Sequence, residues 1–128
     1  MPPRTASAAP PPFVYLDFQY EEGLLYICIA NAGPGAAHRI PSELSRVIKG
    51  PGGKELNGLK VFKEIGFLPP GKNIRVFVDT FESYSRRGQP KVMDAKVVFR
   101  DASGRRHVGM MHHDLTIYDD MVSLERRQ

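Results

Sequence analysis

The sequence predicts an all-β protein, an immunoglobulin-like antiparallel β-sandwich of about seven strands. Three observations favour this fold. Apolar and polar residues alternate along several short segments, as they do in half-buried strands. Turns rich in glycine and proline separate these segments at intervals of about 8 to 15 residues. No segment has the apolar periodicity of a long amphipathic helix. A closed barrel is the alternative arrangement of such strands.

Residues 1–12 precede the first expected strand, and they contain five of the eleven prolines. A segment of this composition cannot bury a core, so we expect a semi-extended, flexible tail. The sandwich is expected at residues 13–118. Residues 119–128 would form a short C-terminal extension, in which Asp119 and Asp120 can cap a helical turn.

The first two strands are predicted from different patterns. Apolar side chains occupy every second position from Val14 to Tyr20, so one face of this strand is buried. Residues 24–30 are apolar throughout, which is typical of a central strand covered on both faces. The sequence from Asn31 to Gly35 ends this strand, since asparagine can hydrogen-bond its own backbone and Gly33 and Gly35 can supply positive φ angles.

A proline interrupts the next segment. Residues 36–40 and 44–48 flank Pro41, which cannot donate a hydrogen bond to a sheet, so we expect an edge strand or a kinked strand here. Pro41 and the nearby charges would oppose unwanted pairing along such an edge. Residues 50–53, Gly-Pro-Gly-Gly, form a loop. A weak strand at residues 56–62 and a short apolar run at residues 65–68 follow.

The second half of the chain has the clearest alternation. The strand at residues 72–79 follows Pro70 and Gly71, which suit the centre of a type II turn. After a polar loop at residues 82–89, two strands at residues 91–100 and 106–118 form a hairpin around residues 101–104. The side chains expected on the inner faces of these three strands are Ile74, Val76, Val78, Ala95, Val97, Phe99, Met111, Leu115 and Ile117.

Three segments carry a resemblance to a known family. Residues 25–36 are similar to an apolar strand followed by Asn-x-Gly-x-Gly/Pro-Ala, and residues 68–71 to a Leu-x-Pro-Gly turn. Residues 97–104 are similar to a late hairpin in which Phe99 replaces a common tyrosine. In this order, across residues 13–118, they resemble bacterial immunoglobulin-like domains of the CARDB and NPCBM-associated type. The resemblance implies a sandwich fold in a bacterial protein and no particular activity.

The net charge and its distribution limit the classes of partner that we expect. The formal net charge is +4, and arginine pairs stand at residues 86–87, 105–106 and 126–127. The chain has no block of like charges and no aromatic residues interleaved with basic ones, so nucleic acid is not the expected partner. A basic surface that binds nucleic acid or anionic lipid remains an alternative. The longest uncharged apolar run, residues 24–32, is too short to span a membrane.

Candidate chemistry is sparse. Cys28 is the single cysteine and lies in an apolar strand, so we expect a buried, unreactive thiol and a reducing, cytoplasmic location. His112 and Asp114 would share one strand face, whereas His113 points away. A zinc site needs three or four ligands, and would require His107 or His38 nearby. We therefore expect no cofactor and no enzymatic activity, with a small metal-dependent enzyme as a second alternative.

The segment at residues 81–87 is the candidate contact site. Phe81, Tyr84, Arg86 and Arg87 lie in a loop at the end of the predicted sandwich. Tyrosine and arginine are common at interface hot spots, and such loops often carry recognition. The alternative is that Phe81 and Tyr84 cap the core. The function expected is a non-catalytic protein-interaction or spacer module. It would bind an unidentified protein or a second copy of itself through its edge strands or through this loop.

Overall fold

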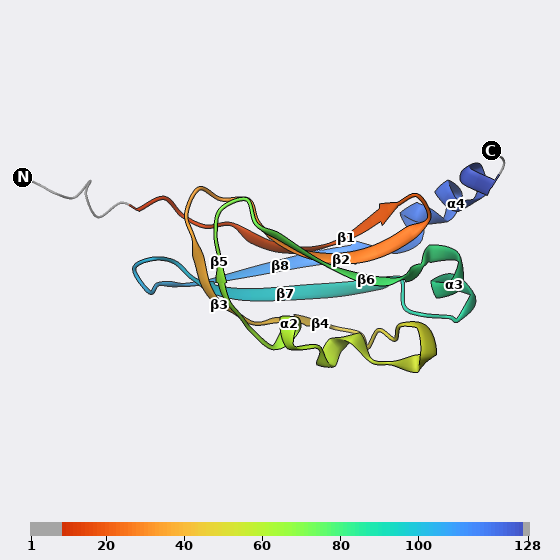
Figure 1. The fold of residues 1–128 in the computed structure, drawn as a ribbon, viewed down its shortest axis with the longest axis horizontal. Helices are drawn as coiled ribbons and strands as arrows, with labels where there is room; N and C mark the ends of the chain where they lie inside the picture. Colours follow the sequence, from red (N-terminus) through yellow and green to blue (C-terminus); the bar gives the residue numbers. More distant parts are fainter. Residues whose placement is uncertain (1–8, 127–128) are drawn as a thin grey trace, which may run out of the picture.

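A computed structural model describes residues 9–126, and it confirms the predicted sandwich of two antiparallel sheets (Figure 1). The first sheet has the strand order β1 (Val14–Glu21), β2 (Leu24–Asn31), β6 (Asn73–Thr80). The second sheet is formed by β3 (Ala37–Ile40), β4 (Ser42–Leu44), β5 (Ile65–Leu68), β7 (Val92–Arg100) and β8 (Arg106–Asp114). The short helices are α2 (Lys60–Lys63), α3 (Phe81–Arg86) and α4 (Asp119–Arg126), with single 3-10 turns at Pro51–Gly53, Leu56–Gly58 and Leu115–Tyr118.

The inner faces of the two sheets make the core, as the alternation predicts. Val97 is fully buried, and the exposed fraction of Phe99 is 5%. Every predicted inner-face residue of β6 and β7 packs in or against this core. Ile117 is the exception at 65% exposure, because the last strand ends at Asp114 rather than at residue 118. The Asp114 carboxylate accepts a hydrogen bond from the Thr116 N–H and so starts a 3-10 turn.

β3 and β4 run beside β7 as one strand that Pro41 kinks. β3 also pairs with β5, so the prediction of an edge strand is wrong for β3, whereas β4 pairs with β7 alone and lies at the edge of the sheet. The prediction of a kinked strand is confirmed. From His38 to Ser42 is four steps, whereas their partners Arg100 and Val97 are three steps apart. The extra residue makes a bulge at Arg39, whose φ is 51°.

The segment after β4 differs from the expected strands. Only residues 42–44 pair with β7, and residues 56–62 form a 3-10 turn and the short helix α2. Leu56 and Phe62 nevertheless reach the core with 7% and 4% exposure. Leu56 and Phe62 therefore reach the core from two separate turns, and not from one face of a strand.

The free edge of β1 is closed by side chains of the second sheet. The Leu16 N–H donates to the Met111 sulfur at 3.3 Å, and His113 Nε2 lies 2.9 Å from the Leu16 carbonyl oxygen. The Tyr118 hydroxyl donates to the Phe18 carbonyl at 3.3 Å. These contacts occupy backbone groups that would otherwise be open to pairing with another chain.

Asn31 joins three segments at one end of the sandwich. Its Oδ1 accepts from the Phe13 and Gly33 N–H groups, and its Nδ2 donates to the carbonyls of Gly35 and Leu68. Gly33 and Gly35 do not have the positive φ angles that we expected. They are needed for close packing, because a Cβ at Gly35 would stand 2.0 Å from the Pro10 carbonyl oxygen.

This packing moves the start of the folded region. The Gly35 N–H donates to the Pro11 carbonyl, and Pro12 is buried, so residues 10–12 belong to the sandwich rather than to a tail. The predicted tail otherwise falls on residues 1–8, which lie outside the described residues. The turn at Pro70 and Gly71 is confirmed as type II, since Gly71 has a φ of 80° and the Lys72 N–H donates to the Pro69 carbonyl.

Asn31→Ala should lower the free energy of unfolding by about 3 kcal/mol, because it leaves several buried backbone groups without partners. Urea unfolding monitored by circular dichroism measures this loss. The exposed Asn73→Ala is the matched control and should change stability by less than about 0.5 kcal/mol. Equal effects of the two substitutions would show that Asn31 does not join these segments.

Candidate functional site

The segment at residues 81–87 is helix α3 rather than a polar loop. The Thr80 hydroxyl caps its N-terminus by accepting from the Ser83 N–H. Phe81 and Tyr84 have 1% and 0% exposure, so both rings lie in the core. The Tyr84 hydroxyl donates to the Pro90 carbonyl, and burial raises its pKa. These two aromatic side chains cap the core, which was the alternative interpretation, and they are not available to a partner.

Arg87 holds a buried carboxylate. Its Nη2 and Nε lie 2.7 and 3.2 Å from Asp79 Oδ2. Burial of Asp79 favours its neutral form, but hydrogen bonds from Arg87, Ser83 and the Thr80 N–H outweigh burial and lower its pKa. Arg87 therefore stabilises the junction of β6 and α3, and of the four predicted contact residues only Arg86 is exposed.

The arginine pairs do not form one basic surface. Residues 86–87 lie beside α3, and residues 105–106 lie at the β7–β8 turn, at the opposite end of the molecule (Figure 1). The side chains of the third pair, residues 126–127, lie outside the described residues. The two pairs that the structure describes therefore cannot act together as a single dense patch.

The predicted metal-ligating residues are held apart by other contacts. His112 Nδ1 lies 2.7 Å from Asp94 Oδ1, and the Asp114 carboxylate caps the following turn. His107 Nε2 lies 2.9 Å from Asp101 Oδ2 in the hairpin turn. Among the described residues, no three histidine, cysteine, aspartate or glutamate side chains converge.

The outer face of β7 and β8 carries exposed apolar side chains. Val98 pairs with Val108, and the next position on β8, Met110, pairs with Lys96. Val108 and Met110 are 46% and 65% exposed. The solvent side of an antiparallel sheet is ordinarily polar, so exposed apolar side chains here mark a candidate contact surface. We call Val98, Val108 and Met110 the apolar rows.

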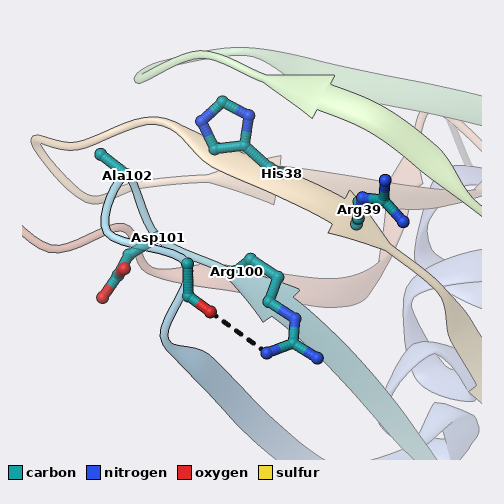
Figure 2. Close-up of a pocket in the computed structure, with 6 residues that line it drawn as sticks. His38, Arg39, Arg100, Asp101 and Ala102 are labelled. Carbon is teal, nitrogen blue, oxygen red and sulfur yellow. Dashed lines mark hydrogen bonds between the residues drawn. The ribbon is translucent and has the colours of Figure 1, made fainter.

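A hollow with arginine side chains adjoins the apolar rows. It has a volume of about 440 Å³ and is lined by His38, Arg39, Arg100, Asp101, Ala102 and Gly104. Figure 2 shows Arg39 on β3 and Arg100 on the neighbouring β7, with the β7–β8 turn to their left. Arg106 pairs with Arg100 across the hairpin, so its side chain emerges on the same outer face.

The single carboxylate of the hollow is already engaged. Asp101 Oδ1 accepts from the Ser103 hydroxyl and from the Ser103 and Arg105 N–H groups, and Oδ2 contacts His107. The hydrogen bonds from Ser103 and His107 lower the pKa of Asp101 far below its usual value. In Figure 2 this carboxylate is turned away from Arg39 and Arg100. The hollow is therefore a cationic surface. Its own carboxylate, that of Asp101, accepts hydrogen bonds within the β7–β8 turn.

Sequence reasoning did not single out this hollow. The opposition of Arg100 and Arg106 follows from the predicted hairpin and could have been found from its register. The placement of Arg39 could not, because it depends on the bulge in β3 and on pairing between residues distant in sequence.

Arg87→Met should lower the free energy of unfolding at pH 7 by about 2 kcal/mol, because it leaves the buried Asp79 carboxylate without its cation. Because its pKa is lowered in the folded protein, the Asp79 carboxylate stabilises the fold at pH values above the usual aspartate pKa, about pH 4. This stabilisation is lost as the pH falls below that value. Without Arg87, only the hydrogen bonds from Ser83 and the Thr80 N–H would oppose the effect of burial, so the pKa of Asp79 should rise. The stability difference between wild type and variant should therefore shrink between pH 7 and pH 3 in urea unfolding. A constant difference would contradict this ion pair.

Comparisons with known proteins extend the description of the chain. None of the helices within residues 9–126 has the length and apolar character needed to cross a bilayer. Comparison with curated proteins and with solved structures returns no match. The profile of a family described as "Domain of unknown function (DUF8453)" matches residues 4–119. Since this match spans most of the sequence, the chain belongs to the DUF8453 family.

Proposed function

We propose that the chain is a non-catalytic protein-interaction module that binds an acidic segment of a partner protein across the outer face of β7 and β8. The observation that carries this proposal is the exposure of Val108 and Met110 beside a cationic hollow. Apolar area supplies affinity, and arginine side chains supply orientation and charge complementarity.

The geometry favours this face over the outer edges of β1 and β5. The β1 edge is occupied by Met111, His113 and Tyr118, and the outer strand β5 has four residues. An added strand would find few open backbone groups along these edges. A partner that lies across the outer face needs no such groups.

The same contacts support a non-catalytic protein over the alternatives. His107, His112 and His113 each contact a turn, a strand neighbour or a strand edge. Cys28 is fully buried, and burial raises the pKa of its thiol, which opposes nucleophilic chemistry. A lone buried thiol also fits the reducing bacterial cytoplasm, where we place this module.

Site-specific cross-linking tests the proposal. A photoreactive phenylalanine analogue replaces Met110 in one protein and Phe77 in the control, because Phe77 is 48% exposed on the first sheet. We expect position 110 alone to give a discrete cross-linked protein in extracts of the native host, competed by the unlabelled chain. The same product from both positions, or from neither, would overturn the proposal.

Binding of the identified partner then gives the quantitative check. Val108→Glu places a charge of the partner's own sign in the apolar rows and should weaken calorimetric binding at least tenfold, about 1.4 kcal/mol. Phe77→Glu, the matched change on the first sheet, should leave the affinity unchanged. Equal loss in both variants would mean that the partner does not recognise the β7–β8 face.

A further inference from the structure

Two features at the hollow beside β3 are unfavourable for folding. Arg39 has a φ of 51°, in the left-handed region where a Cβ is unfavourable. Arg100 and Arg106 stand directly opposite each other on neighbouring strands, where like charges repel. Strained backbone and local conflicts of this kind concentrate at functional sites. Both arrangements converge on one small surface.

Within residues 9–126, the cations of this surface have no carboxylate counter-ion. Among the described residues, neither Arg39, Arg100 nor Arg106 forms an ion pair, although other arginines such as Arg75 and Arg87 do. Arg100 Nη1 donates to the Gly104 carbonyl at 3.1 Å, which orients its guanidinium group and leaves its other N–H groups available. The guanidinium group of Arg100 is therefore held in place, and the positive charge of this surface is available to an external anion.

The number and kind of donors indicate which anion fits. Guanidinium groups bind carboxylate and phosphate oxygens through paired hydrogen bonds. A carboxylate could neutralise one of the three arginines, whereas a phosphoryl dianion has more charge and three oxygens to share among them. His38 lines the same hollow, and its ring nitrogens are a further source of a donor.

We propose that this hollow binds the phosphoryl group of a phosphorylated segment in the partner protein. The inference rests on the proposed interaction function and names the chemistry that the partner presents. Val98 and Val108 adjoin Arg100 and Arg106 along the two strands, so residues next to the phosphorylated position can lie on the apolar rows. This continuity favours a peptide over a nucleotide, because a mononucleotide held by its phosphate has no neighbouring side chains to lie along the apolar rows.

Nuclear magnetic resonance titrations of the full chain at pH 7.5 and constant ionic strength test the inference. The probes are inorganic phosphate, a short phosphoserine peptide, its unphosphorylated form and adenosine monophosphate. Inorganic phosphate should give saturable amide shifts at residues 38–40 and 100–104. The phosphoserine peptide should bind at least fivefold more tightly and also shift residues 96–98 and 108–110. The unphosphorylated peptide should cause no saturable shift.

Three variants assign the binding to the hollow. Arg39→Gly removes one cation at a φ that glycine adopts freely, so it should weaken phosphate binding at least fivefold without lowering the melting temperature. Arg100→Gln should weaken binding to a similar degree. Arg86→Gln is the control, because it removes an exposed arginine at the opposite end of the molecule, and it should leave binding unchanged.

Several results would overturn the inference. These are the absence of saturable shifts with phosphate, equal weakening by Arg86→Gln, or tighter binding of adenosine monophosphate than of the phosphoserine peptide. The titrations use no partner protein, so their failure is separate from that of the cross-linking experiment. A partner that cross-links at residue 110 while phosphate fails to bind would leave the interaction function standing and remove this inference alone.

Discussion

The dry contact between the inner faces of the two sheets is the constraint on which the rest of the structure depends. β2 and β7 supply its centre, where Ile27 and Val97 are fully buried. Each strand must present alternate side chains to this interior, since burial of apolar area is the main source of folding free energy. Turns, helices and edges are arranged around that requirement: α3 adds the rings of Phe81 and Tyr84 to the core, and Asn31 fastens the opposite end.

The bulge at Arg39 shows how this constraint produces a surface site. Ala37 and Ile40 are three residues apart, so a regular strand would turn one of them outward, yet both are fully buried. One extra residue restores the inward position of Ile40 and leaves His38 and Arg39 toward solvent beside Arg100. The left-handed backbone at Arg39 is thus required by packing in the core, whereas the choice of arginine there is not.

The edge of β1 and the outer face of β7 and β8 differ in how far other side chains cover them. The edge of β1 is capped by side chains from β8 and from the turn after it, which satisfies backbone groups without adding a strand. The outer face of β7 and β8 instead leaves Val108 and Met110 in solvent next to uncompensated arginines. Protection of the β1 edge and exposure of the β7–β8 face together favour association at this face over association at that edge.

Local patterns determined the sheet content, the inner faces of β1, β6 and β7, and the turns at Gly71 and residues 101–104, because strand alternation and turn chemistry act between near neighbours. The same short range explains the failures. The segment with aromatic and arginine residues forms a short helix whose two aromatic rings are buried, and Arg87 after it pairs with Asp79. The chain beyond Asp114 forms a 3-10 turn instead of continuing the strand. The cationic hollow was decided only by tertiary structure, since it joins β3 to a hairpin some sixty residues later through pairing that no local pattern encodes.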